Sequence, residues 1–141
     1  MAKKILIIED HIDAREMLAL ILRHKGYEPL EAMDGNEGLA MTLAHHPDLI
    51  LMDLGLPGMD GFETARKIKE NLQTSQIPIV ACSAWGRREM AARARQAGME
   101  EYIVKPVTFV AIVEVIERLT QKTRATDPNK SPSASESAVQ A

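Results

Sequence analysis

Two short apolar runs constrain the fold of this chain most strongly. They read "KKILIIED" at residues 3–10 and "DLILMD" at residues 48–53. In both runs the apolar residues are consecutive and do not alternate with polar ones, which is typical of strands buried on both faces. Strands of this kind belong to parallel sheets that carry helices on both sides. The two runs therefore predict an α/β fold.

The rest of the chain continues this pattern of short apolar runs followed by longer amphipathic segments. We expect strands at 3–10, 27–32, 48–53, 77–83 and 101–105, and helices at 14–25, 35–45, 61–71, 86–97 and 108–122. Strict alternation of five strands with five helices implies right-handed crossovers and a doubly wound parallel sheet.

Several residues predict local features of these elements. Pro29 suggests that its strand lies at a sheet edge, because proline cannot donate to a ladder. Asp34 is expected to cap the helix that follows it, and Gly26 to end the helix before it. Spacing predicts that two sets of apolar residues face the core, namely Phe62, Ala65 and Ile68, and Val110, Val113, Ile116 and Leu119.

Length and composition favour one domain with a tail. The 141 residues carry a net charge of −3, so the chain lacks the excess of positive charge that is typical of nucleic-acid-binding proteins. The single cysteine, Cys82, is expected in the core and excludes an internal disulfide, and this fits a cytosolic protein. We see no membrane span and no signal peptide. Residues 122–141 are rich in Ser, Ala and Pro and are expected to be disordered, which leaves a domain at 1–121.

Polar residues gather where the expected strands end. Glu9 and Asp10 end the first strand, Asp53 the third, Ser83 the fourth and Lys105 the fifth. Since ligands of such sheets bind beyond the carboxyl ends of the strands, we expect these five residues to form one site.

Three neighbouring carboxylates repel one another unless a cation lies between them, and oxygen ligands suit Mg²⁺, or Mn²⁺ in its place. Asp53 is the central acid and is the expected nucleophile for an aspartyl phosphate. The ammonium of Lys105 and the hydroxyl of Ser83 can then stabilise phosphoryl oxygens.

The motifs "IIED", "LMDLGLPGMDG", "ACSA" and "YIVKP", in this order over residues 3–121, resemble the response-regulator receiver domain of bacterial two-component signalling. The resemblance implies a flavodoxin-like (βα)5 fold with strand order 2-1-3-4-5. It also implies that Glu9 and Asp10 are the acidic pair, Asp53 the phosphoacceptor, Ser83 the switch hydroxyl and Lys105 the family's lysine.

Further roles follow only from the resemblance. The backbone carbonyl of Gly55 would be a metal ligand, the Lys105–Pro106 peptide bond would be cis, and Tyr102 would be the switch aromatic. Gly55 and Trp85 depart from common family residues at positions that set how fast water reaches the acyl phosphate. The lifetime of the phosphoryl group is therefore left open.

The interpretation is a stand-alone cytoplasmic receiver and not an enzyme, beyond assisting its own phosphorylation and slow autodephosphorylation. Its partners would be a sensor histidine kinase or a histidine phosphotransfer protein, and a downstream protein bound through the fourth helix, fifth strand and fifth helix. It would signal by phosphorylation-dependent binding or by phosphorelay, without direct contact to nucleic acid or membrane.

Two alternatives remain at this point. A Mg²⁺-dependent phosphohydrolase would also use an aspartyl phosphate, but it usually has a second acid where this chain has Gly55. A receiver-like interaction module without phosphorylation is disfavoured by the complete set of site residues. Asp60 is interpreted as a turn or capping residue and not as a ligand, and the pair His45–His46 as the end of a helix.

Overall fold

The computed structural model describes residues 2–55, 60–84 and 88–125. Strands and helices alternate through these ranges. Their bounds are β1 Lys4–Ile8, α1 Ile12–His24, β2 Glu28–Ala32, α2 Gly35–His45, β3 Leu49–Asp53, α3 Gly61–Glu70, β4 Ile79–Ser83, α4 Arg88–Gln96, β5 Glu101–Val104 and α5 Phe109–Ala125.

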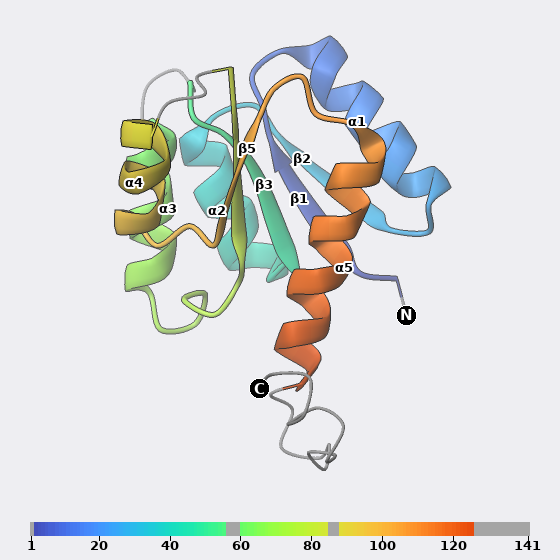
Figure 1. Cartoon of the computed structure of the whole chain (residues 1–141). Helices are drawn as coiled ribbons and strands as arrows, with labels where there is room; N and C mark the ends of the chain where they lie inside the picture. Colours follow the sequence, from blue (N-terminus) through green and yellow to red (C-terminus); the bar gives the residue numbers. More distant parts are fainter. Residues whose placement is uncertain (1, 56–59, 85–87, 126–141) are drawn as a thin grey trace, which may run out of the picture.

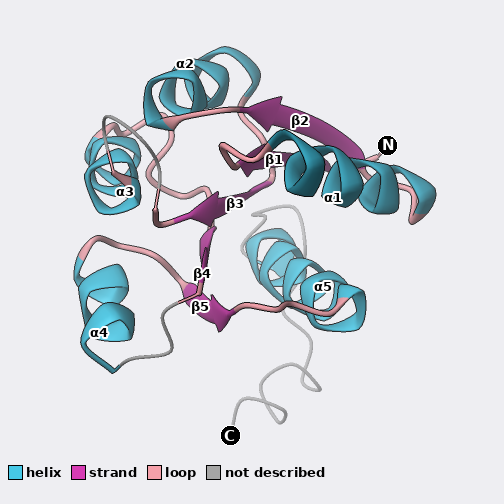
Figure 2. Ribbon diagram, turned by 90° about the horizontal axis from the view of Figure 1, so that it is seen from above, coloured by secondary structure: helices cyan, strands magenta, loops and turns pink. Residues whose placement is uncertain are grey.

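The strands form one parallel sheet at the centre of the molecule (Figure 1), and Figure 2 shows their order from above, β2-β1-β3-β4-β5. All of the ladders between neighbouring strands are parallel. The predicted doubly wound fold and strand order 2-1-3-4-5 are thus confirmed. Pro29 lies in β2, an edge strand, as expected for a residue that cannot donate a ladder hydrogen bond.

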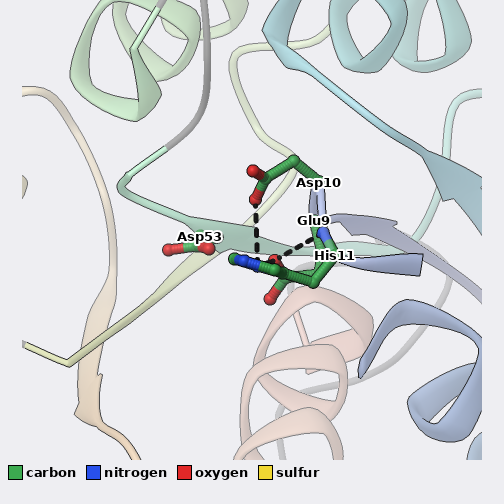
Figure 3. Close-up of side chains that lie close together, drawn as sticks. All are labelled: Glu9, Asp10, His11 and Asp53. Atoms are coloured by element: carbon green, nitrogen blue, oxygen red, sulfur yellow. Dashed lines mark hydrogen bonds and ion pairs between the residues drawn. The ribbon is translucent and has the colours of Figure 1, made fainter. Parts of the chain in front are cut away.

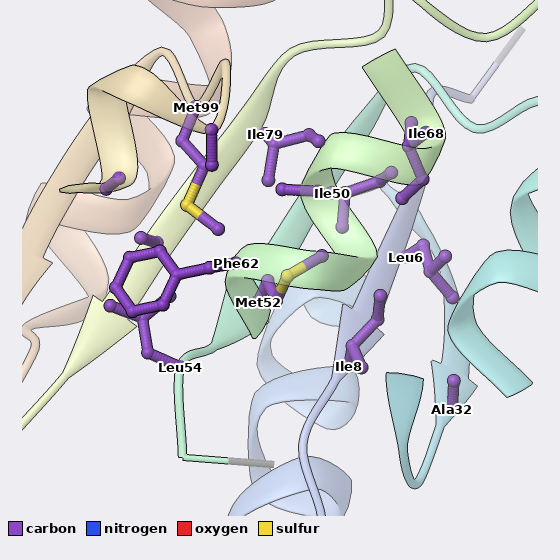
Figure 4. Packing of buried hydrophobic residues seen from close by; sticks show 14 residues of the cluster. Leu6, Ile8, Ala32, Ile50, Met52, Leu54, Phe62, Ile68, Ile79 and Met99 are labelled. Atoms are coloured by element: carbon purple, nitrogen blue, oxygen red, sulfur yellow. The ribbon is translucent and has the colours of Figure 1, made fainter. Parts of the chain in front are cut away.

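Helices cover both faces of the sheet. Seen from above in Figure 2, α1 and α5 lie on one side and α2, α3 and α4 on the other. Because successive strand residues point to opposite faces, Ile5 and Ile7 pack in the core under α1 and α5, whereas Leu6 and Ile8 pack in the other core. Figure 4 shows the second cluster, with Phe62 of α3 packed among strand residues. Each such fully buried side chain contributes about 1.5–3 kcal/mol to folding.

Capping predictions also agree with the structure. The Asp34 carboxylate accepts a hydrogen bond from the backbone N–H of Glu37 at 2.8 Å and begins α2. Asp60 does the same for α3, with the N–H of Glu63 at 2.8 Å. Gly26 follows α1 with φ of 95°, a conformation that favours glycine. The interpretation of Asp60 as a capping residue is therefore confirmed.

One core assignment was wrong. Val110 is 77% exposed and Val113 is only half-buried, whereas the buried apolar stripe of α5 consists of Ile112, Val115, Ile116 and Leu119. The prediction followed steps of three residues, each of which falls about 60° short of a full helical turn. Over the three steps from Val110 to Leu119 the stripe drifts by about half a turn, so Val110 leaves the face that covers the sheet.

Helix α5 extends to Ala125, three residues past the expected end at Lys122. Residues 126–141 of the predicted tail lie outside the described residues. Among the helices that the structure describes, none combines the length and the apolar character that crossing a membrane requires.

Candidate functional site

The carboxyl edge of the sheet brings the predicted site residues together. Glu9 and Asp10 directly follow β1, and Asp53 is the last residue of the adjacent parallel strand β3. Lys105 follows β5, and its backbone N–H donates to the carbonyl oxygen of Ser83 at the end of β4, at 2.7 Å. The order of the strands therefore places residues almost 100 positions apart in sequence at one edge.

Three carboxylates and one imidazole form a compact cluster at this edge. One oxygen each from Glu9, Asp10 and Asp53 and one ring nitrogen of His11 all lie within 4.8 Å of one another (Figure 3). The Nδ1 atom of His11 lies 3.1 Å from Glu9 Oε2 and 3.4 Å from Asp10 Oδ1. Sequence reasoning missed His11. The only available signal was its position directly after the acidic pair.

Lys105 neutralises part of this charge. Its Nζ atom lies 3.0 Å from Glu9 Oε1 and 3.5 Å from Asp53 Oδ2. Burial by itself would raise the pKa of Glu9, but the hydrogen bond from Lys105 and those from the backbone and ring of His11 outweigh it and lower this pKa to about 2. Burial opposes the charge of Lys105 too, yet the bond to Glu9 and the charge of Asp53 raise the pKa of the ammonium.

The surroundings of Asp53 shift its pKa in the direction opposite to that of Glu9. Its pKa is raised, first because the carboxylate is buried and also because the charge of Glu9 lies close by. The hydrogen bond from the Gly55 backbone N–H to Asp53 Oδ1, at 3.1 Å, and the charge of Lys105 oppose this shift without cancelling it. Asp53 is thus a carboxylate that gains from any additional positive charge at the site.

The donor set fits a hard divalent cation. Three carboxylates and one ammonium leave two negative charges uncompensated. Asp10 Oδ1 is buried and accepts no hydrogen bond, an arrangement that costs free energy unless a cation or another donor binds the oxygen. Oxygen ligands of this kind suit Mg²⁺ or Mn²⁺, and Glu9, Asp10 and Asp53 are the side chains able to hold it.

Arg15 fixes the backbone that carries the acidic pair. Its Nη1 atom donates to the carbonyl oxygen of Glu9 at 2.9 Å, and its Nε atom donates to Glu31 Oε1 at 3.1 Å. This side chain is only 12% exposed, so it ties α1, the end of β1 and β2 together. Arg15 was not predicted as part of the site, because its partners depend on side-chain direction.

The remaining predicted residues differ in position and exposure. Ser83 is buried, Tyr102 on β5 is half-buried, and Gly55, two residues after the strand end at Asp53, is exposed. The Lys105–Pro106 peptide bond is cis, as the resemblance implied. Trp85 lies outside the described residues. Asp60 caps α3 and does not join the acidic cluster.

A cavity of about 570 Å³ opens beside Asp53 and Lys105. Most of its lining is apolar, and α1 and α5 contribute Met17, Leu18 and Phe109 to it beside residues of the strands. Met17 and Phe109 are 58% and 48% exposed. Large apolar side chains at such a rim are typical of a surface that a partner covers.

Comparison with known proteins gives one consistent result. The family described as "Response regulator receiver domain" matches residues 5–117. The polar-differentiation response regulator DivK of Brucella ovis is 34% identical over 117 residues, which are 83% of this chain and 95% of DivK. The phosphate regulon transcriptional regulatory protein PhoB of Pseudomonas aeruginosa is 38% identical over 129 residues, which are 92% of this chain and 55% of PhoB.

Solved structures agree with these relatives. The chemotaxis response regulator CheY4 of Vibrio cholerae matches with a TM-score of 0.80 and 28% identity, covering 84% of this chain and 99% of CheY4. The receiver domain of the sensor histidine kinase PA1611 from Pseudomonas aeruginosa, described with a magnesium ion coordinated in its active-site cleft, matches with a TM-score of 0.80 and 27% identity, over 86% of this chain and 99% of that domain.

Proposed function

Because the chain belongs to the response regulator receiver domain family, we propose that Asp53 is the residue on which it accepts a phosphoryl group. Members of this family are phosphoacceptors of two-component signalling, and this chain is one of them. The observation that carries the assignment is the place of Asp53 at the end of β3, beside two further acids and 3.5 Å from the ammonium of Lys105.

The acceptor step is a displacement at phosphorus. A carboxylate oxygen of Asp53 forms a bond to the phosphorus of a phosphohistidine, the phosphorus–nitrogen bond breaks, and the released imidazole takes up a proton. Glu9, Asp10, Asp53 and the carbonyl of Gly55 would hold Mg²⁺, or Mn²⁺ in its place. When bound, this ion supplies positive charge to the phosphoryl oxygens and brings no other chemistry.

Lys105 and Ser83 respond to the new charge. A phosphoryl group adds roughly two negative charges at pH 7. The Lys105 ammonium, which pairs with both Glu9 and Asp53, can exchange one of these carboxylates for a phosphoryl oxygen through a charge-assisted hydrogen bond. The Ser83 hydroxyl, at the neighbouring strand end, can donate to a second oxygen.

The donor of the phosphoryl group is a sensor histidine kinase or a histidine phosphotransfer protein, which reaches Asp53 at the rim of the cavity. The exposed apolar residues Met17 of α1 and Phe109 of α5 support contact with a protein at this rim. A small molecule such as acetyl phosphate would not use these side chains. Exchange of Met17 for a charged residue should therefore slow transfer from the protein donor and not from acetyl phosphate.

The output is binding of a downstream protein, or onward transfer of the phosphoryl group, through the face formed by α4, β5 and α5. Tyr102 belongs to β5, within this face, and it lines a cavity of about 270 Å³ together with residues of α4. If the Ser83 and Lys105 side chains move towards the phosphoryl group, the Tyr102 side chain can shift from one of two orientations to the other. Phosphorylation then changes the populations of two conformations that already exist. The chain assists its own phosphorylation and a slow autodephosphorylation and has no other enzymatic role.

Phosphorylation by acetyl phosphate in the presence of Mg²⁺ tests the assignment. Intact-protein mass spectrometry should show one added phosphoryl group on the wild-type chain and none on Asp53→Asn. Asp60→Asn is the matched control, because Asp60 caps α3 and asparagine caps helices equally well. Equal labelling of the wild-type chain and Asp53→Asn would refute the assignment.

A further inference from the structure

We propose that the ring nitrogen Nδ1 of His11 is an additional ligand of the metal site, and that it makes this site prefer Mn²⁺ and Co²⁺ over Mg²⁺ more strongly than carboxylates alone would. The inference rests on the metal site described under the proposed function and concerns its selectivity. Mg²⁺ favours oxygen ligands, whereas an imidazole nitrogen adds more to the binding of first-row transition ions, with Co²⁺ above Mn²⁺ in the order of affinity.

The distances around His11 are those of neighbouring ligands on one ion. When two neighbouring ligand atoms each lie about 2.1 Å from an octahedrally coordinated ion and subtend a right angle at it, they are about 3 Å apart. The Nδ1 atom lies 3.1 Å from Glu9 Oε2 and 3.4 Å from Asp10 Oδ1. Since the whole set of ligand atoms spans at most 4.8 Å, an ion can contact the ring without a change of the fold.

The local backbone explains why the ring lies there. His11 is the N-cap residue of α1, but its side chain accepts no capping hydrogen bond from the backbone N–H groups of the first helical turn. Its backbone N–H donates to Glu9 Oε2 at 3.2 Å, which fixes the main chain next to the acids. The ring therefore turns from the helix towards the carboxylates (Figure 3).

Two further observations favour a ligand role for the ring. The His11 side chain is 76% exposed, so Nε2 can keep its proton and bond to water while the lone pair of Nδ1 binds the ion. Asp10 Oδ1, which lies 3.4 Å from Nδ1, is buried without a hydrogen-bond donor. A cation between His11 Nδ1 and Asp10 Oδ1 would be bound by both atoms.

The competing interpretation is that the ring only donates a hydrogen bond to Glu9. In that case removal of the ring would change the affinity for Mg²⁺ and for Mn²⁺ by similar factors, because only the orientation of Glu9 would suffer. A ligand role predicts unequal factors, since the lost nitrogen contributes mainly to the transition ions.

Calorimetry on the full chain separates the two interpretations. We expect His11→Asn to weaken the binding of Mn²⁺ and Co²⁺ by about tenfold or more and that of Mg²⁺ by less than about threefold. Asparagine is favoured at an N-cap, so this variant should fold. The double variant His45→Asn/His46→Asn, at the end of α2, is the matched control for binding of these ions to surface histidines and should behave like wild type.

Pulsed electron paramagnetic resonance of the Mn²⁺-loaded chain gives a direct readout. The wild-type chain and the double variant should show modulation from a bound nitrogen nucleus, and His11→Asn should not. Absence of this modulation in wild type, or equal losses of Mg²⁺ and Mn²⁺ affinity in His11→Asn, would overturn the proposal while leaving the role of Asp53 intact. If the wild-type chain bound neither ion, both this inference and the metal site beneath it would fail.

Discussion

Exchange of Asp53 for Asn is expected to stabilise the protein when no divalent ion is added, although it removes the proposed phosphoacceptor. Asn has nearly the same shape as Asp, and its amide oxygen can still accept the hydrogen bond from the Gly55 N–H that Asp53 Oδ1 accepts at 3.1 Å. The main change is thus the loss of one negative charge from a crowded and largely buried cluster.

The magnitude follows from the distances. Oxygens of Glu9 and Asp10 lie within 4.8 Å of an Asp53 oxygen. At an effective dielectric constant of about 20, each such pair repels by about 3.5 kcal/mol, and a pair of opposite charges about 3.5 Å apart attracts by about 5 kcal/mol. Lys105 supplies one attraction of this kind, so the two repulsions exceed it by about 2 kcal/mol. Because Asp10 is 30% exposed and partly screened by water, we expect a gain of about 1–2 kcal/mol in unfolding free energy.

Urea denaturation followed by circular dichroism measures this gain, in buffer with a chelator at about pH 7.5. The pKa of Asp53 is raised in the folded protein, so its destabilising effect is complete above the folded pKa and disappears below the unfolded pKa of about 3.9. The difference between variant and wild type should therefore shrink as the pH falls towards 4. Added Mg²⁺ should stabilise wild type more than the variant, because the variant lacks one ligand. A variant less stable than wild type in chelator would refute the charge-crowding argument, and Asp60→Asn, a change at a helix cap, should be nearly neutral.

Three further predictions use the same structure. Lys105→Ala should bind Mg²⁺ as tightly as wild type or more tightly, yet lose the effect of phosphorylation on partner binding; normal switching with weaker Mg²⁺ binding would contradict the role given to this ammonium. The pKa of Glu9 is about 2 in the folded protein instead of 4.5, so wild type should lose on the order of 2 kcal/mol of unfolding free energy as the pH falls from about 4.5 to 2. When stability is measured against pH in this range, Glu9→Gln should show a flatter profile than wild type. Truncation after Ala125 should leave the denaturation midpoint unchanged, since residues 126–141 contain almost no large apolar side chains; a clear fall would show that this segment packs on the domain.

The strands were predictable because their apolar runs are unambiguous. Ile5–Ile8 and Leu49–Met52 are buried on both sides of the sheet, and no helical periodicity competes with them. Parallel order then places the acids of different strand ends at one edge without any knowledge of side-chain directions. Fold and acidic site were therefore accessible from residue order alone.

Side-chain direction was not accessible in the same way. Val110 was misplaced because a spacing of three residues drifts around a helix, and only packing against the sheet selects the stripe that contains Ile116. His11 was missed because a histidine after an acidic pair has several possible roles, and its ring orientation depends on the backbone bond to Glu9. Lys105 lies closer to Glu9 than to Asp53, and this too depends on the conformation of its side chain in the folded protein.

Chemical trapping of the acyl phosphate tests the central claim most directly. The chain is phosphorylated in the presence of Mg²⁺ and treated with borohydride, which reduces an aspartyl phosphate to homoserine, and the peptides are then sequenced by mass spectrometry. The account predicts homoserine at position 53 and none in a sample that received no phosphoryl donor. Homoserine at Asp10 or Asp60 instead, or a stable phosphoester on Ser83, would contradict it.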